Sequence, residues 1–363
     1  MKKWMIGLFF SILLLPNIAG LAVGEKEASN TENRDLARWP EFSWETIDEF
    51  PSGVESFIND NAPLRSIWLD AYASLNMELF GSIDNKEVIV GKDHWLFYTG
   101  NESVIDALGI GFFSDEDLQM ILDKLLAVRE KYAEDKEDFA LLVAPNKEIV
   151  YSQYMPEHYG SLSETSRAKQ LVEYIRANSD IKVVYPLEEL KAASEEELIY
   201  YKTDTHWNKL GGFIGAQALI AAAGGTPADY HDLALSYEGG QRGDLGDLGH
   251  TPMKYLEETE VLIHGYLEGL SVEMLENDDG GTGLIRTRTP DSPDERSLTM
   301  VRDSFGAAME PVLPRYFREV VLINWKFMDN IDVAGFGGDV FVYEIVERNL
   351  GRLPGDLDVL LAK

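Results

Sequence analysis

Along the last two thirds of the chain, hydrophobic residues alternate between two patterns: helical spacing and short continuous runs. After Ser114, a candidate N-cap, apolar residues follow at helical spacing: Leu118, Ile121, Leu122, Leu125 and Val128. The next apolar run, "FALLVAP" at 139–145, is short and continuous, as in strands that are buried on both faces. This order predicts a helix followed by a buried strand.

The alternation continues towards the C-terminus. Further helices are expected near Ser166–Ala177 and over Leu210–Ala223, with Gly224 and Gly225 ending the second. Further strands are expected at "IKVVYP" (181–186), "SLTMVRDS" (297–304), "VVLINW" (320–325) and a closing "VFVYEIVE" (340–347), with a helical stretch around Pro311 and Pro314 between the second and third. Helices that alternate with buried strands predict an α/β sandwich with a mostly parallel sheet. In such sheets, functional sites form at the carboxyl ends of the strands.

The segments outside this alternation follow other patterns. Residues 33–81 carry apolar positions at helical spacing and predict a helical lead-in, and "VIVGKDHWLFY" (88–98) predicts a hairpin. Tyr237–Pro252 and Glu276–Gly283 are glycine-rich and polar, so we expect irregular structure there. Neither segment has the spacing of a phosphate-binding loop, which leaves nucleotide binding without support.

The N-terminus has the pattern of an export signal. Lys2 and Lys3 precede an uncharged run from Trp4 to Gly24, which fits either a cleaved signal peptide or a retained membrane anchor. Under both interpretations the remainder is expected outside the cytoplasm. We therefore divide the chain into a signal or anchor at 1–24, a linker with the helical lead-in at 25–85, and a catalytic domain at 86–363.

Composition narrows the possible functions. The 363 residues are 45% hydrophobic, which suffices for a sizeable core, and 63 acidic against 32 basic residues give a net charge of −31. Such a charge repels nucleic acid, so no nucleic-acid partner is expected. The absence of cysteine excludes disulfides, thiolate metal sites and cysteine nucleophiles.

The candidate chemistry centres on a serine and a histidine. Ser304 stands where a parallel strand turns into a helix, so its hydroxyl is exposed and its backbone N–H faces any oxyanion formed there. The small residues that follow it, Gly306, Ala307 and Ala308, are expected to leave room for a substrate. A serine nucleophile requires a base that a third group orients.

His206 and Asp204, in "YYKTDTHWNKLGG", supply such a pair, because both side chains of an extended D-x-H segment leave the backbone on the same side. His158, His231 and His264 have no acid at a useful spacing, apart from Asp232 beside His231, whose side chain is expected to point away. Two alternatives stay open: Ser304 as a helix N-cap, and a metal site in which Asp204 and His206 are joined by Asp244, Asp247 or His250. The serine chemistry is preferred, and it needs no metal or other cofactor.

Several stretches together resemble the SGNH-hydrolase-like proteins of alginate O-acetylation, the family that includes the DHHW proteins. They are "FINDNAPLR", "VIVGKDHWLFY", "VAPNKEIVY", "TDTHWNKLGG", "RGDLGDL" and "VRDSFG", within residues 33–347. The resemblance implies an α/β/α sandwich and acetyl transfer to hydroxyls of an extracytoplasmic polysaccharide. It also implies Ser304 as nucleophile, His206 as base, Asp204 as orienting acid, and a membrane-bound O-acyltransferase as acetyl donor.

Three aspects of this interpretation stay open. A polyanionic acceptor is disfavoured by the −31 charge unless a local basic patch offsets it. An acetylesterase of the same fold and a non-catalytic scaffold that binds glycan or acyltransferase are the alternative functions. For the oxyanion, the N–H of Ser304 is the first candidate donor and Asn146, at the end of "LLVAPN", the second.

Overall fold

The computed structural model describes residues 4–7, 10, 37–44, 47–61, 65–80, 82–83, 85–133, 135, 138–160, 162–249, 251 and 258–363. Most of the predicted signal or anchor at 1–24 lies outside these residues. Within them, no helix combines the length and the apolar character that crossing a bilayer requires. The chain forms two compact units: unit 1 is Met1–Ile89 with Asp244–Leu256, and unit 2 is Val90–Gly243 with Glu257–Lys363.

Unit 1 is mainly helical where it is described, with irregular backbone over residues 37–44. Its helices are α2 (Phe50–Asp60), α3 (Arg65–Phe80) and α10 (Asp244–Leu248). A proline at the start of α2 suits the first turn of a helix, because the N–H donor that proline lacks would have no acceptor within the helix there. The first two of these helices lie in the stretch that the sequence assigns to a helical lead-in. A small hairpin follows: β1 (Val88–Val90), in which the boundary between the units falls, pairs with β2 (Leu96–Tyr98).

Unit 2 is built around a seven-stranded sheet in the order β4-β3-β11-β9-β10-β8-β7. Its strands are β3 (Phe139–Ala144), β4 (Lys182–Val184), β7 (Glu273–Asp278), β8 (Leu284–Arg288), β9 (Ser297–Arg302), β10 (Glu319–Asn324) and β11 (Val340–Val346). The five strands from β4 to β10 pair in parallel, whereas β8 and β7 add antiparallel at one edge. The predicted α/β fold with a mostly parallel sheet is therefore confirmed.

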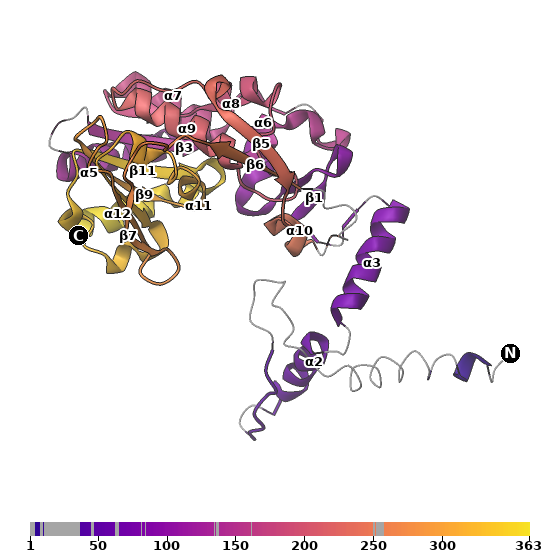
Figure 1. Cartoon of the computed structure of the whole chain (residues 1–363). Helices are drawn as coiled ribbons and strands as arrows, with labels where there is room; N and C mark the ends of the chain where they lie inside the picture. The colour runs from indigo at the N-terminus through magenta and orange to yellow at the C-terminus, as the bar shows by residue number, and fades with distance from the viewer. Residues whose placement is uncertain are drawn as a thin grey trace. The chain divides into compact units, whose positions relative to one another are not determined.

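Helices cover both faces of this sheet (Figure 1). The helices of unit 2 are α4 (Ser103–Ala107), α5 (Asp115–Tyr132), α6 (Lys147–Val150), α7 (Arg167–Asn178), α8 (Leu187–Ser194), α9 (Lys209–Ala222), α11 (Ser304–Ala307) and α12 (Leu353–Ala362). Leucine, isoleucine and valine side chains of α5, α7 and α12 form one buried cluster with alternate residues of β3 and β11. On the opposite face lies α9, which is buried along nearly its whole length. Burial on both faces explains why the central strands read as continuous apolar runs.

Three sequence expectations are corrected by the structure. The last element is helix α12 rather than the strand "VFVYEIVE", and Pro311 and Pro314 lie in a turn-rich segment that contains only a short 3₁₀ helix, Leu313–Arg315. The glycine-rich segments were expected to be irregular, yet they contribute the ends of β7 and of β5 (Ala234–Gly239), which pairs with β6 (Thr259–His264). Strands β5 and β7 are largely exposed, so no hydrophobic alternation marks them in the sequence.

Candidate functional site

The D-x-H segment lies on a loop between α8 and α9. An isolated antiparallel bridge between Tyr200 and Trp207 closes this loop, and the N–H of Tyr201 donates to the carbonyl of His206 at 3.2 Å. Directly after it, the side chain of Asn208 caps α9 by accepting from the N–H groups of two residues in the first turn. The loop is therefore held at both of its ends.

Trp207 joins this loop to the serine turn. Its indole is buried and donates from Nε1 to the carbonyl of Phe305 at 2.9 Å, one residue after Ser304. Helix α9 approaches closely because its glycines lack side chains: a Cβ on Gly215 would lie 2.7 Å from the Trp207 ring, and one on Gly212 would lie 2.7 Å from the Cβ of Ala308. These glycines cost helix stability, and they permit the contact that aligns the two functional segments.

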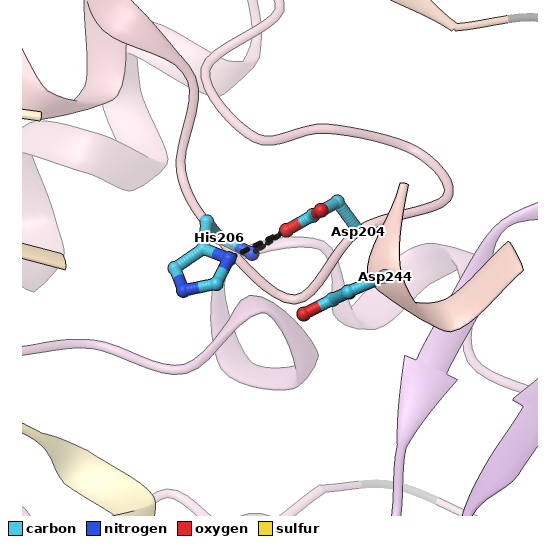
Figure 2. Close-up of side chains that lie close together, drawn as sticks. All are labelled: Asp204, His206 and Asp244. Atoms are coloured by element: carbon cyan, nitrogen blue, oxygen red, sulfur yellow. Dashed lines mark hydrogen bonds and ion pairs between the residues drawn. The ribbon is translucent and has the colours of Figure 1, made fainter. Parts of the chain in front are cut away.

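Asp204 and His206 form a hydrogen-bonded pair (Figure 2). One carboxylate oxygen, Oδ1, accepts from both the backbone N–H of His206, at 2.9 Å, and the ring atom Nδ1, at 2.6 Å. The two bonds fix the rotation of the imidazole and favour the tautomer that carries its proton on Nδ1. The hydroxyl of Thr205 lies a further 3.3 Å from Nδ1. Both side chains are partly exposed, with 28% for His206 and 21% for Asp204.

Ser304 completes the constellation. Its Oγ lies 2.7 Å from Nε2 of His206, although 98 residues separate the two in sequence. The serine begins α11 directly after β9, at the carboxyl edge of the sheet, and is exposed, as its position in the sequence predicted. The N-cap of this helix is Asp303, so the alternative that Ser304 itself is the cap is wrong. The structure therefore brings all three predicted residues into one chain of hydrogen bonds, Asp204–His206–Ser304.

Two buried carboxyl groups hold the turn that presents the serine. Asp303 accepts from the N–H of Phe305 at 2.9 Å and from the N–H of Val346 at 2.8 Å, which connects the turn to β11. Glu344 accepts from the N–H groups of Asp303 and Gly306, and its burial, together with the charge of Asp303, raises the pKa of this carboxyl well above its usual range. Among the described residues, the N–H of Ser304 donates no hydrogen bond, so it is available as an oxyanion donor.

The small residues after Ser304 have a different purpose from the one expected. A Cβ on Gly306 would lie 2.6 Å from the Arg302 side chain and 2.7 Å from an oxygen of Glu344, so this glycine makes room for internal groups rather than for a substrate. Ala308 packs against Gly212 of α9. The expectation of a substrate approach over these residues is therefore corrected for Gly306 and Ala308.

A second D-x-H pair was missed in the sequence. Asp229 Oδ1 accepts from the backbone N–H of His231 at 3.0 Å and from its Nδ1 at 2.6 Å, which repeats the geometry of Asp204 and His206. The expectation that His231 has no acid at a useful spacing is thus wrong, because Asp232 was considered and Asp229 was not. Nε2 of His231 meets Glu196 at 3.0 Å instead of a serine, and both members of the pair are more than half exposed. The bonds with these acids raise the pKa of His231.

Asn146 follows β3 at the same edge of the sheet as Ser304. Its side chain is fully buried; Oδ1 lies 3.4 Å from Nη1 of Arg348, whereas Nδ2 has no hydrogen-bond partner among the described residues. Arg348 also lies 3.5 Å from Oγ1 of Thr205 and stacks on Phe305, the neighbours of His206 and Ser304. The sequence analysis did not single out Arg348, although a charged residue two positions after the buried strand β11 is a signal of a functional edge.

The metal alternative stays open, and the hydrogen bonds of His206 constrain how an ion could bind there. A neutral imidazole has one N–H and one lone pair, and in His206 these face Asp204 and Ser304. A metal ion bound to this ring would have to displace one of them. Of the other candidate ligands, Asp244 and Asp247 lie on α10 of unit 1, and His250 lies outside the described residues.

Known proteins resemble this chain in sequence. The family described as the SGNH hydrolase-like domain of acetyltransferase AlgX matches residues 88–251, which include Asp204 and His206 and end before Ser304. A probable alginate O-acetylase AlgJ of Pseudomonas syringae pv. tomato is 27% identical over 177 residues. These residues are 48% of this chain and 42% of that protein, so the chain spans less than half the length of this relative.

Solved structures resemble it in fold. A DHHW family protein from Eubacterium siraeum superposes with a TM-score of 0.54 and 16% identity, over 76% of this chain and 98% of its own. Bacillus cereus PatB1, solved with a sulfonyl adduct, gives 0.53 and 16% over 75% of this chain and 98% of its own. The predicted resemblance is thus confirmed: the chain is similar to AlgX/AlgJ-type O-acetyltransferases and has an SGNH-hydrolase-like α/β fold.

Glu347, at the end of β11, is a buried acid beside this site. Its carboxyl accepts from the N–H of Asn146 at 3.1 Å and from the hydroxyls of Ser166, at 2.8 Å, and Tyr185, at 3.3 Å. Burial is the largest cause that raises the pKa of Glu347, to about 7. In the unfolded chain the same group loses its proton at lower pH, near its ordinary pKa of 4.5.

We therefore predict that the contribution of Glu347 to the free energy of unfolding decreases as pH rises. The stability associated with its neutral form is fully present below about pH 4.5 and is lost as the pH rises through about 7, by roughly 3 kcal/mol at most. In Glu347→Gln this part of the pH dependence should disappear. Urea unfolding at pH 5 and pH 8 measures it, with Glu157→Gln, whose side chain is 87% exposed, as control. Equal pH dependence in Glu347→Gln and the wild type would contradict the assignment.

Proposed function

We propose that this protein is an extracytoplasmic serine O-acetyltransferase that modifies hydroxyl groups of a polysaccharide. The observation that carries the proposal is the continuous chain of hydrogen bonds from Asp204 through His206 to the exposed Ser304. Such a chain activates a hydroxyl nucleophile and serves acyl transfer on several unrelated folds. The similarity to a probable alginate O-acetylase and to the AlgX domain supports acetyl as the acyl group and a polysaccharide as the acceptor.

The reaction would proceed by double displacement. In the first half, Oγ of Ser304 attacks the acetyl carbonyl, Nε2 of His206 takes the hydroxyl proton, and the carboxylate of Asp204 stabilises the resulting imidazolium. Collapse of the tetrahedral intermediate breaks the bond to the donor, whose leaving group receives the proton from His206. The products of this half are an acetyl ester on Ser304 and the free donor alcohol or thiol.

In the second half, a sugar hydroxyl is the nucleophile. His206 takes its proton while the sugar oxygen attacks the acetyl-serine, and then returns the proton to Oγ of Ser304. The N–H of Ser304 is the oxyanion donor in both halves of this proposal, since the N–H groups of Phe305 and Gly306 in the same turn already donate to Asp303 and Glu344. Water in place of the sugar would make the same protein an acetylesterase.

The N-terminal pattern and the net charge bear on the cellular compartment, the acetyl donor and the acceptor. Lys2 and Lys3 before an uncharged run to Gly24 support work outside the cytoplasm, where acetyl groups have to be delivered across the membrane. We therefore propose a membrane-bound O-acyltransferase as the donor partner. Because the net charge is −31, a neutral or amino-containing glycan suits the surface better than a polyanion does.

Substitutions in the hydrogen-bond chain should remove activity without unfolding the protein. Ser304→Ala removes the nucleophile and His206→Ala the base, so we expect both to abolish hydrolysis of an activated acetyl ester. Asp204→Asn should lose about 10²- to 10⁴-fold in turnover because the imidazole loses its preferred tautomer. Initial rates and circular dichroism of each variant measure the two effects separately.

The matched controls are His231→Ala and Asp229→Asn, because that pair has the same local geometry and no serine opposite it. We expect wild-type rates for both. Full activity in folded Ser304→Ala would rule out this nucleophile. An equal loss of activity in the His231 and His206 variants would contradict His206 as the specific catalytic base.

Transfer to an acceptor distinguishes the proposed activity from an esterase. If the acetyl-serine is attacked by sugar hydroxyls, adding oligosaccharide to the activated ester should produce acetylated sugar at the expense of free acetate. Mass spectrometry of the sugar and of the peptide that contains Ser304 measures both the product and the intermediate. Acetate release that no acceptor diminishes would favour the esterase, and the absence of acetylated Ser304 from rapidly quenched samples would favour the non-catalytic scaffold.

Asn146 is the second candidate oxyanion donor. Its buried Nδ2 lies at the same edge of the sheet as Ser304 and has no hydrogen-bond partner among the described residues. A donor aimed at developing charge typically contributes 10²- to 10³-fold in turnover. We expect Asn146→Ala to lower kcat by more than tenfold with little change in KM. Steady-state kinetics of the variant measure this, and a reduction of less than threefold would dismiss Asn146 as a donor.

A further inference from the structure

The loop that carries Asp204 has no regular secondary structure, so its backbone polar groups need other partners. On the carbonyl side the partner is Lys147, at the start of α6. Its Nζ donates to the carbonyls of Tyr201 at 3.2 Å, Lys202 at 3.3 Å and Asp204 at 2.5 Å. A single ammonium group therefore gathers three carbonyls of one loop.

The side chain of Lys147 also lies beside two aromatic rings. The side chain is 1% exposed, and Nζ lies 5.8 Å and 5.4 Å from the ring centroids of Trp95 and Phe97, which follow the turn of the β1–β2 hairpin. Removing an ammonium from water costs several kcal/mol unless strong acceptors replace the water. The loop carbonyls and the two aromatic faces supply that replacement.

Two N–H groups of the same loop donate to a buried carboxylate. Glu258, directly before β6, accepts from the N–H of Lys202 at 2.8 Å, and from the N–H and the hydroxyl of Thr203 at 2.7 and 2.6 Å. This carboxylate is 7% exposed. The hydroxyl of Thr203 in turn accepts from the N–H of Gly243 at 3.1 Å, where any side chain would collide with Thr203 and Asp204.

A buried cation and a buried anion thus hold one short loop through complementary groups. A charged group makes shorter and stronger bonds to backbone dipoles than a neutral one does, so the peptide planes of Tyr201–Asp204 are fixed more firmly than water could fix them. Asp204 lies at the end of this held segment, and its carboxylate sets the direction of the His206 ring. Displacement of the segment would therefore be transmitted to the contact between Nε2 and Ser304.

We propose that Lys147 and Glu258 are positioning residues for the proposed acyl transfer: they act through Asp204 and His206 and do not touch the reacting atoms. The proposal rests on the proposed function for its effect on rate, whereas its effect on the imidazole is independent of the reaction. A purely structural role would lower stability and leave both the rate per folded molecule and the state of His206 unchanged.

The test compares Lys147→Met and the isosteric Glu258→Gln with two controls that remove the same chemistry elsewhere. Lys131 donates to the carbonyls of Leu360 and Leu361 beside an aromatic ring, so Lys131→Met is the matched lysine control. Asp339 accepts from the N–H and the hydroxyl of Ser297, so Asp339→Asn is the matched acid control. The fraction of folded protein is measured by circular dichroism and urea unfolding for each variant.

Two readouts are taken on the folded fraction. Steady-state kinetics should show kcat lowered by about 10- to 100-fold with KM nearly unchanged in the Lys147 and Glu258 variants, because a small misplacement of a catalytic group costs that much. Nitrogen-15 NMR of labelled histidine should show the Nδ1–H tautomer of His206 in the wild type and a tautomer mixture in these variants. The signals of His231, assigned with His231→Ala, are the internal reference, and both controls should match the wild type.

The outcomes separate the two hypotheses. Folded variants with wild-type kcat and an unchanged His206 tautomer would overturn the positioning role. A changed tautomer in a protein whose Ser304→Ala variant remains active would support the positioning role and refute the proposed function. If Lys147→Met does not fold, the milder Lys147→Gln and Glu258→Gln decide by the same two readouts.

Discussion

The contact between Nε2 of His206 and Oγ of Ser304 is the interaction on which the site depends. It joins a loop between two helices to a strand-to-helix turn 98 residues later, and neither segment determines the other through local sequence. Beneath it, the bond from the Trp207 indole to the carbonyl of Phe305 fixes the same two segments through buried atoms. The exposed contact between His206 and Ser304 can therefore be short and well aligned, because the buried bond from Trp207 to Phe305 already holds the two segments in position.

Several buried ionisable side chains surround this contact. Asp303 and Glu344 hold the serine turn, Lys147 and Glu258 hold the histidine loop, and Glu347 holds the backbone of Asn146. Each group bonds to backbone N–H or carbonyl groups in loops and turns or at the ends of helices and strands. Burial of such groups lowers stability unless every bond is made, so the arrangement exchanges stability for a fixed geometry.

The sequence predicted those helices and strands whose burial produces a recognisable pattern of hydrophobic residues. Strands covered on both faces, such as β3 and β11, appear as continuous apolar runs, and the capping box at Ser114 and Asp117 marks the start of α5. The exposed strands β5 and β7 carry no such mark, and α12 follows the last apolar run without a distinct signal. The roles of Lys147 and Glu258 could not be predicted, because most of their partners are backbone atoms 54 or more residues away, which leave no trace in composition or spacing.

The two D-x-H pairs show where sequence information ends. Asp204 with His206 and Asp229 with His231 have the same bond from acid to ring, 2.6 Å in both, because that bond depends only on two residues and the peptide between them. What differs is the group beyond the ring: a serine hydroxyl for His206 and a second carboxylate, Glu196, for His231. A carboxylate there favours the protonated ring and raises the pKa of His231, whereas a hydroxyl can give its proton to a neutral ring. The local motif therefore orients an imidazole in both places, and only the long-range contact to Ser304 gives the His206 ring a hydroxyl to activate.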